Sequence, residues 1–142
     1  MIKFLIITTF SLFVNYACAN DNIINERIKN FKSAKQSMKV INQSLIKENY
    51  LHINDHILFL YNWFKILPSY FPLGSEASMT NNSDASAEIW ENFALFKKYS
   101  NNSKNISLKI LKSLDKNERK NIQLKFDELA RSCSTCHRKF RN

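Results

Sequence analysis

Cys133-Ser134-Thr135-Cys136-His137, close to the C-terminal end of the chain, is the stretch from which the fold can be worked out. Its pattern is C-x-x-C-H, the spacing by which haem is attached covalently. Each thiol adds to one vinyl group of the porphyrin, and the imidazole that follows can bind the iron as an axial ligand. Only five residues follow His137, so we expect the haem to be attached to the last helix of the chain.

Two other uses of a Cys-x-x-Cys pair compete with haem attachment. A redox dithiol of the thioredoxin type belongs to a strand-rich context, whereas the surroundings here are helical and a histidine follows the pair. A zinc half-site needs a second pair of ligands, and only His52 and His56 could supply one, far upstream. The i, i+4 spacing of those histidines also fits a polar face at the start of a helix. Haem attachment is the favoured interpretation.

The first nineteen residues have the pattern of a secretory signal peptide. Lys3 gives a positive start, residues 4–14 are mostly apolar, and Ala17-Cys18-Ala19 is an A-x-A cleavage site. The apolar run is shorter than the roughly 20 residues of a spanning helix. Lipid attachment at Cys18 and an uncleaved anchor are minor alternatives. We therefore expect residues 1–19 to be a signal peptide, residues 20–142 to be one haem domain, and the protein to reach the periplasm.

The composition of residues 20–142 favours helices. The sequence has one glycine and two prolines, which suits long helices better than a sandwich or a barrel. Loss of Lys3 with the signal peptide lowers the formal charge from +9 to +8. A basic surface could attract an acidic redox partner or an anionic membrane surface, although a solvated exterior rich in Lys and Asn is the preferred explanation. Nucleic acid is not an expected partner of an exported haem protein.

Apolar periodicity predicts four helical segments. The first covers about residues 22–48 and the second about 52–67, ending before Pro68. An irregular stretch, 68–84, precedes a third helix that begins near Ser86 and has a weak point at 99–105. The fourth begins with Asp115 as N-cap and Glu118 three residues later, in the manner of a capping box. The expected fold is all-α, an antiparallel four-helix bundle with covalent haem on the last helix.

With these features in view, the chain resembles the class II c-type cytochromes, that is, the cytochrome c prime family and its low-spin relatives. Four patches carry the resemblance: RIKNFK at 27–32, YFPLGS at 70–75, AEIWENFALF at 87–96 and CSTCHRKFR at 133–141. Each patch except the last is weak alone, but the four in this order are highly specific. They extend over nearly all of the chain that follows the signal peptide.

The resemblance implies roles for individual residues. Cys133 and Cys136 would bind one haem c through thioether bonds, and His137 would be the axial ligand of the iron. Arg27 matches an arginine that reaches a haem propionate, although a solvated arginine is the plainer alternative. Arg141 matches an arginine beside the proximal face, and it could also satisfy the C-terminal dipole of its helix. Two further positions, Trp90 and Phe96, match packing residues of the core around the haem.

Phe31 departs from the low-spin members of the family. Those proteins have a methionine four residues after the arginine, and its sulfur is the sixth ligand of the iron. A phenyl ring has no lone pair to donate, so Phe31 predicts a distal pocket with a vacant sixth site. Met38 shares the same helix face but lies about 10 Å further along. Met79 could reach the iron only by a fold-back of its loop.

The resemblance therefore implies a haem protein that transfers electrons, binds nitric oxide or carbon monoxide, or does both. The alternative is a low-spin electron carrier with Met38 as sixth ligand. Enzymatic turnover such as peroxidase activity is not expected, because no acid–base side chain falls on the helix face around Phe31. We expect no catalytic residues. The expected partners are a diatomic gas, a redox protein and a second copy of the chain, since members of the family often form dimers.

Overall fold

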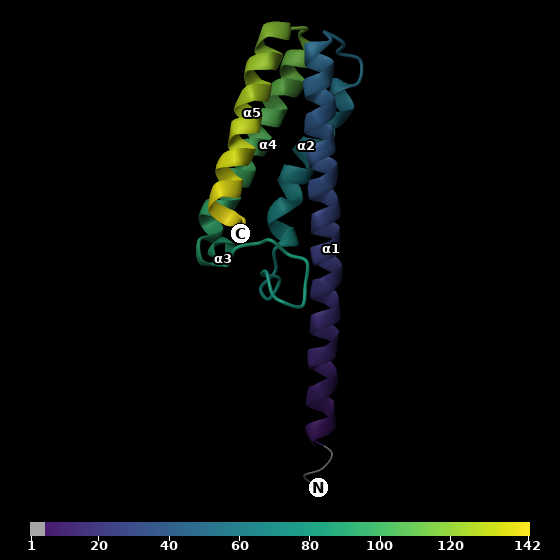
Figure 1. Cartoon of the computed structure of the whole chain (residues 1–142), viewed down its shortest axis with the longest axis vertical. Helices are drawn as coiled ribbons and strands as arrows, with labels where there is room; N and C mark the ends of the chain where they lie inside the picture. The colour runs from purple at the N-terminus through teal and green to yellow at the C-terminus, as the bar shows by residue number, and fades with distance from the viewer. Residues whose placement is uncertain (1–4) are drawn as a thin grey trace.

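The computed structural model describes the backbone of residues 5–142 and the side chains of residues 21–142. Its elements are α1 (Leu5–Ile46), α2 (Ile53–Ile66), η1 (Leu67–Tyr70), α3 (Glu88–Glu91), α4 (Phe93–Asp115) and α5 (Arg119–Phe140). The four long helices lie side by side in an antiparallel bundle, with the short η1 and α3 on the connection between α2 and α4 (Figure 1). The predicted fold class is confirmed.

Helix α1 begins earlier than residue 22, where the sequence pattern places its start. It begins at Leu5, so the segment interpreted as a signal peptide continues into the bundle helix and projects past the bundle (Figure 1). Residues 1–4 lie outside the described part of the chain. No helix among the described residues is both long enough and apolar enough to cross a membrane. Removal of residues 1–19 stays a prediction.

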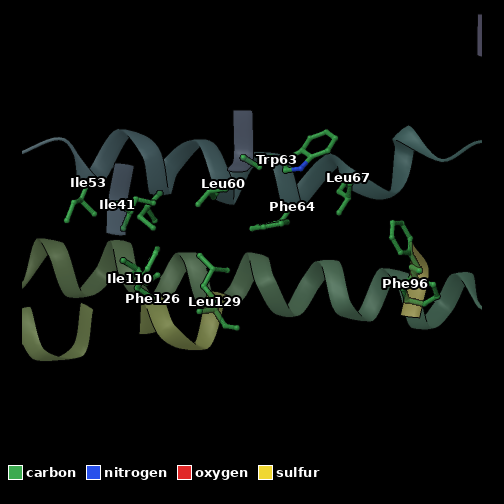
Figure 2. Close-up of a cluster of buried hydrophobic side chains, with 14 of the residues drawn as sticks. Ile41, Ile53, Leu60, Trp63, Phe64, Leu67, Phe96, Ile110, Phe126 and Leu129 are labelled. Carbon is green, nitrogen blue, oxygen red and sulfur yellow. The ribbon is translucent and has the colours of Figure 1, made fainter. Parts of the chain in front are cut away.

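The bundle core is a continuous cluster of apolar side chains from all four long helices. Figure 2 shows its labelled members between the helices; those that are fully buried include Ile41, Ile53, Leu60, Ile110 and Leu129. Every third or fourth residue of each helix points inward, as the apolar periodicity predicted. Burial of each such side chain stabilises the fold by about 1.5–3 kcal/mol.

Left-handed residues end two of the long helices. Glu48 (φ 51°) follows α1 and Asn117 (φ 55°) follows α4. One residue further on, the amides of Asn49 and Glu118 donate to the carbonyls of Ser44 and Ser113, five residues earlier. This bonding satisfies carbonyls that the helix end leaves free and reverses the chain in few residues. The resulting short links bring consecutive helices together as antiparallel neighbours.

Two expectations for the second half of the chain were wrong. Asp115 is the last residue of α4 and does not cap α5; the N-cap is Glu118, whose carboxylate accepts from the side chain of Asn121. The weak point at 99–105 does not exist, and the break falls earlier, at Asn92 (φ −122°, ψ 40°). Buried serines preserve the helix across the polar stretch: the hydroxyl of Ser100 donates to the carbonyl of Phe64 on α2 at 2.7 Å.

Candidate haem site

The last turns of α5 bring the three residues of the attachment motif onto one side of the helix. Cys133, Cys136 and His137 are spaced by three and four residues, which places them on neighbouring positions of one face. All three line a cavity of about 670 Å³ that also touches α1, α2 and α4. This volume lies within the usual range for cofactor and ligand sites.

Apolar side chains form most of the cavity wall. From α1 come Phe31, Ala34 and Met38, from α2 Leu60 and Phe64, and from α4 and α5 Phe96, Ala130 and Phe140. Such a wall excludes water and suits a flat apolar ring. Two thiols and an imidazole that open into it are the donor set that covalent haem requires. The residues present therefore fit the group that the motif predicts.

Burial sets the protonation of the attachment residues. It raises the pKa of the Cys133 thiol, and it raises the pKa of Cys136 to about 11, with a smaller contribution from Cys133. Both are therefore thiols at neutral pH, unlike the low-pKa thiolate of a redox dithiol. Burial, and after it the charge of Arg141, lowers the pKa of His137. A neutral imidazole keeps the lone pair that an iron ligand needs.

His52 and His56 lie apart from this site. The Nδ1 atom of His56 is 3.2 Å from the hydroxyl of Ser37, and His52 is exposed at the start of α2. Among the described residues, no group of three or more His, Cys, Asp or Glu is arranged to bind a metal ion. Within the described part of the chain, Cys133 and Cys136 therefore have no second pair of zinc ligands beside them.

Phe31 faces His137 from the opposite helix. The centres of the phenyl and imidazole rings are 6.3 Å apart, with an interplanar angle of 71°. Trp63 and Phe71 also contact the phenyl ring, with ring centres at 5.3 Å and 6.5 Å. Phe31 itself is half-buried and lines the cavity. The structure thus brings together the two positions that the sequence placed on the two sides of the iron.

Met38 and Met79 differ in their relation to the cavity. Met38 is half-buried and lines the cavity, seven residues after Phe31 on α1. Met79 is fully exposed in the loop between η1 and α3. Met38 is therefore the methionine that remains near enough to the cavity to compete for the iron.

Arg27 is buried, which excludes a solvated arginine. Its side chain is 2% exposed, and its guanidinium donates to the carbonyls of Tyr70 and Ser75 and to the hydroxyls of Ser75 and Ser83. The guanidinium also lies over the Phe71 ring, 4.2 Å from its centre. Burial lowers the pKa of Arg27 to about 10, with partial compensation by Glu76. Arg27 remains a cation at neutral pH at the edge of the cavity.

Arg141 also lines the cavity. Its Nε and Nη2 atoms donate to one oxygen of Asp84, at 3.1 and 2.7 Å, and its backbone amide donates to the carbonyl of His137. Next to it, Lys139 pairs with Glu88 at 2.8 Å. These contacts fasten the end of α5 to residues 84–88. Arg141 is near enough to His137 for its charge to lower the histidine pKa.

Of the two predicted packing residues, only Phe96 lines the cavity. It is 2% exposed and packs between Phe71 and Phe140. Trp90 does not line it. Its indole nitrogen donates to the carbonyls of Phe71 and Pro72 at 3.1 and 3.0 Å, so it fixes the loop instead.

Sequence reasoning missed the residues that support Phe31 and Arg27. These are Trp63, Phe71, Ser75 and Ser83, which contact α1 across 30 to 60 positions of sequence. Two of them, Phe71 and Ser75, lie inside the YFPLGS patch and could have been suspected from it. The other two carry no signal in their spacing.

Comparisons with known proteins agree with this site. The model of the family described as Cytochrome C' matches residues 22–141. A curated relative, the cytochrome c' of Rhodospirillum rubrum, is 28% identical over 87 residues, which is 61% of this chain and 58% of the relative. The matched part is thus less than two thirds of that relative.

Solved structures share the fold at low identity. A cytochrome c' with ligand-controlled dimer dissociation has a TM-score of 0.79 at 14% identity, with 86% of this chain and 95% of that chain covered. The nitric oxide complex of a mutant cytochrome c prime from Alcaligenes xylosoxidans has a TM-score of 0.75 at 17% identity, with 87% and 95% covered.

Proposed function

Because the chain belongs to the cytochrome c prime family, and so carries covalent haem c, we propose that it is an exported haem protein that binds a diatomic gas. His137 would bind the iron through its imidazole, and Phe31 would cover the other side of the iron without binding it. The single observation that carries this proposal is the placement of the Phe31 ring opposite the His137 ring at 6.3 Å.

The separation of these rings is close to what a haem between them needs. A flat ring in van der Waals contact on both sides requires roughly 7–8 Å, and a metal–imidazole bond of about 2 Å shortens one side. Phe31 can contact the far side but cannot bind the iron. The sixth position is then closed to bulky or anionic ligands by an apolar ring, and it is open to a small gas when that ring moves.

The attachment residues act before any gas is bound. Cys133 and Cys136 would each add across a haem vinyl group, with the sulfur bonded to one vinyl carbon and the thiol proton transferred to the other, and α5 would then hold the group at two points. His137 presents a neutral imidazole from the same helix face. When bound, the haem supplies an iron centre that can change oxidation state and bind a gas.

Arg27 is suited to hold a haem propionate. It is a buried cation at neutral pH and lines the cavity, and its hydrogen bonds go to neutral oxygens of the loop. Glu76 offsets the burial of this charge only in part, so a carboxylate at this rim would be stabilised. Arg141 borders the His137 side and would adjoin a ligand that enters there.

The nitric oxide complex of the A. xylosoxidans protein supports the choice of ligand class. The phenyl ring of Phe31 offers bound oxygen no hydrogen bond, which favours nitric oxide and carbon monoxide. Turnover is not part of the proposal. Among the described residues that line the cavity, the one carboxylate is Asp84, and it pairs with Arg141.

A low-spin electron carrier is the second candidate, because Met38 lines the same cavity on the same helix. If the haem lay about two turns further along α1, the Met38 sulfur could fill the sixth position. A filled coordination sphere would permit electron transfer and exclude gases. The location of Phe31 directly opposite His137 favours the first candidate.

An absorption spectrum of the reduced haem protein, with and without carbon monoxide, separates the candidates. We expect a broad high-spin spectrum that shifts strongly when the gas is added. Sharp low-spin bands that carbon monoxide leaves unchanged would exclude the vacant site and favour Met38.

The charge of the chain and the behaviour of a solved cytochrome c' support two partners for the protein. A basic chain of formal charge +8 after loss of residues 1–19 suits an acidic redox protein. Ligand-controlled dissociation in the dimeric cytochrome c' supports a homodimer here as well. Sedimentation of the haem protein with and without carbon monoxide tests this, and a monomer at all concentrations would contradict it.

A further inference from the structure

Two aromatic walls confine the ring of Phe31. The indole of Trp63 stands perpendicular to it, with ring centres 5.3 Å apart, and the phenyl of Phe71 lies 6.5 Å away. The imidazole of His137 lies on a third side, with its ring centre 6.3 Å from that of Phe31. For the sixth position to open, Phe31 must move against one of the two walls.

The Phe71 wall is fixed. Its backbone amide donates to the carbonyl of Pro68 and its own carbonyl accepts from the indole of Trp90. Its ring is 4.7 Å from the ring of Phe96, and the guanidinium of Arg27 lies over it. Any displacement of Phe71 would disturb several of these contacts at once.

The Trp63 wall is held by packing. Trp63 is 2% exposed, and its indole nitrogen is the one buried side-chain nitrogen or oxygen of the described residues without a hydrogen-bond partner. The ring is held instead between Phe31 and Tyr70, the latter at 5.1 Å. A side chain without a directional bond is positioned by its neighbours' shape. It can therefore shift more readily than Phe71.

Trp63 is also separate from the haem cavity. Figure 2 shows its indole on the opposite side of α2 from Phe64, which lines the cavity. Trp63 itself is not among the described residues of the cavity wall. Trp63 can influence the iron through Phe31, which lines the cavity and also contacts the Trp63 ring.

We infer that Trp63 is a positioning residue for Phe31: the indole supports the phenyl ring over the sixth coordination position and thereby sets how fast a diatomic gas reaches the iron. This inference rests on the proposed function. Phe31 can swing aside only by displacing this indole, with which it makes the perpendicular contact.

Flash photolysis of the carbon monoxide complex of the reduced haem protein measures the rate of gas entry. Loss of one aromatic contact in Trp63→Leu should raise the association rate by roughly fivefold to tenfold. Trp63→Phe keeps an aromatic wall, and we expect it to restore the rate to within about twofold of the wild-type rate. Should Trp63→Leu fail to bind haem, Trp63→Met, which retains more volume, replaces it.

A double-mutant cycle separates positioning from general stability. In a Phe31→Ala background, Trp63→Leu should leave the association rate nearly unchanged, because the ring that it positions is gone. Phe126→Leu, a buried aromatic change away from the cavity, is the control and should leave the rate as in the wild type.

Two results would overturn the inference alone. These are an unchanged rate in Trp63→Leu, and an equal acceleration in the wild-type and Phe31→Ala backgrounds. A wild-type protein that binds no carbon monoxide would overturn the proposed function, and this inference with it.

Discussion

Phe31 and His137 face each other from α1 and α5, so under the proposed function the chemistry of residue 31 would control what the iron can bind. In Phe31→Met, an unbranched thioether replaces a ring that has no lone pair. We expect the reduced protein to change from a high-spin to a low-spin spectrum and to lose its response to carbon monoxide. Phe126→Met, a buried change away from the cavity, should leave the spectrum unaltered. An unchanged spectrum in Phe31→Met would mean that residue 31 does not lie above the iron.

Arg27 decides whether the long loop between η1 and α3 is fixed. Its guanidinium donates to Tyr70, Ser75 and Ser83, and Arg27→Met would remove these hydrogen bonds between α1 and the loop. We expect a loss of about 3 kcal/mol in the free energy of unfolding, measured by urea denaturation of the haem protein. Lys29→Met, exposed on the same helix, should change that free energy by less than about 0.5 kcal/mol. Equal effects of the two changes would contradict the anchoring role of Arg27.

At the scale of the element, α4 depends on small buried side chains. Ser107 is fully buried, and its hydroxyl donates to the carbonyl of Ser103 one turn earlier. Ser107→Leu forces extra volume between packed helices and should destabilise the fold by about 1–3 kcal/mol, as measured by urea denaturation. Asn105→Leu, exposed on the same turn, provides the matched control. A Ser107→Leu protein as stable as that control would show that α4 is loosely packed.

The sequence predicted these elements unevenly, for physical reasons. Apolar periodicity and Pro68 located the helices, because burial of one face dominates their stability. The weak point expected at 99–105 rested on local propensity, which the buried serine contacts with α2 and α5 override. Asp115 and Glu118 fit a capping box by spacing, yet the left-handed Asn117 places the helix start after both of them.

The residues that attach the haem were predictable from the sequence, because covalent attachment requires a fixed spacing between the two cysteines and the histidine. Cys133, Cys136 and His137 must lie on one helix face, so the motif alone identified them. The environment of Phe31 was not predictable in this way. Trp63 and Phe71 reach it through contacts between separate elements, which depend on how the whole bundle packs and leave no local pattern.

At the scale of the whole molecule, α1 links the proposed leader to the haem domain as one helix. The cleavage position therefore decides how much of α1 remains attached to the bundle. We expect the mature haem protein to begin at Asn20, as judged by its intact mass from a periplasmic fraction. Cys18→Ser distinguishes the two kinds of processing, because A-x-A cleavage needs small residues at Ala17 and Ala19 and tolerates serine between them. The variant should therefore mature normally and remain in the periplasmic fraction. Retention of uncut Cys18→Ser protein in the membrane would instead show that lipid attachment at Cys18 directs the processing.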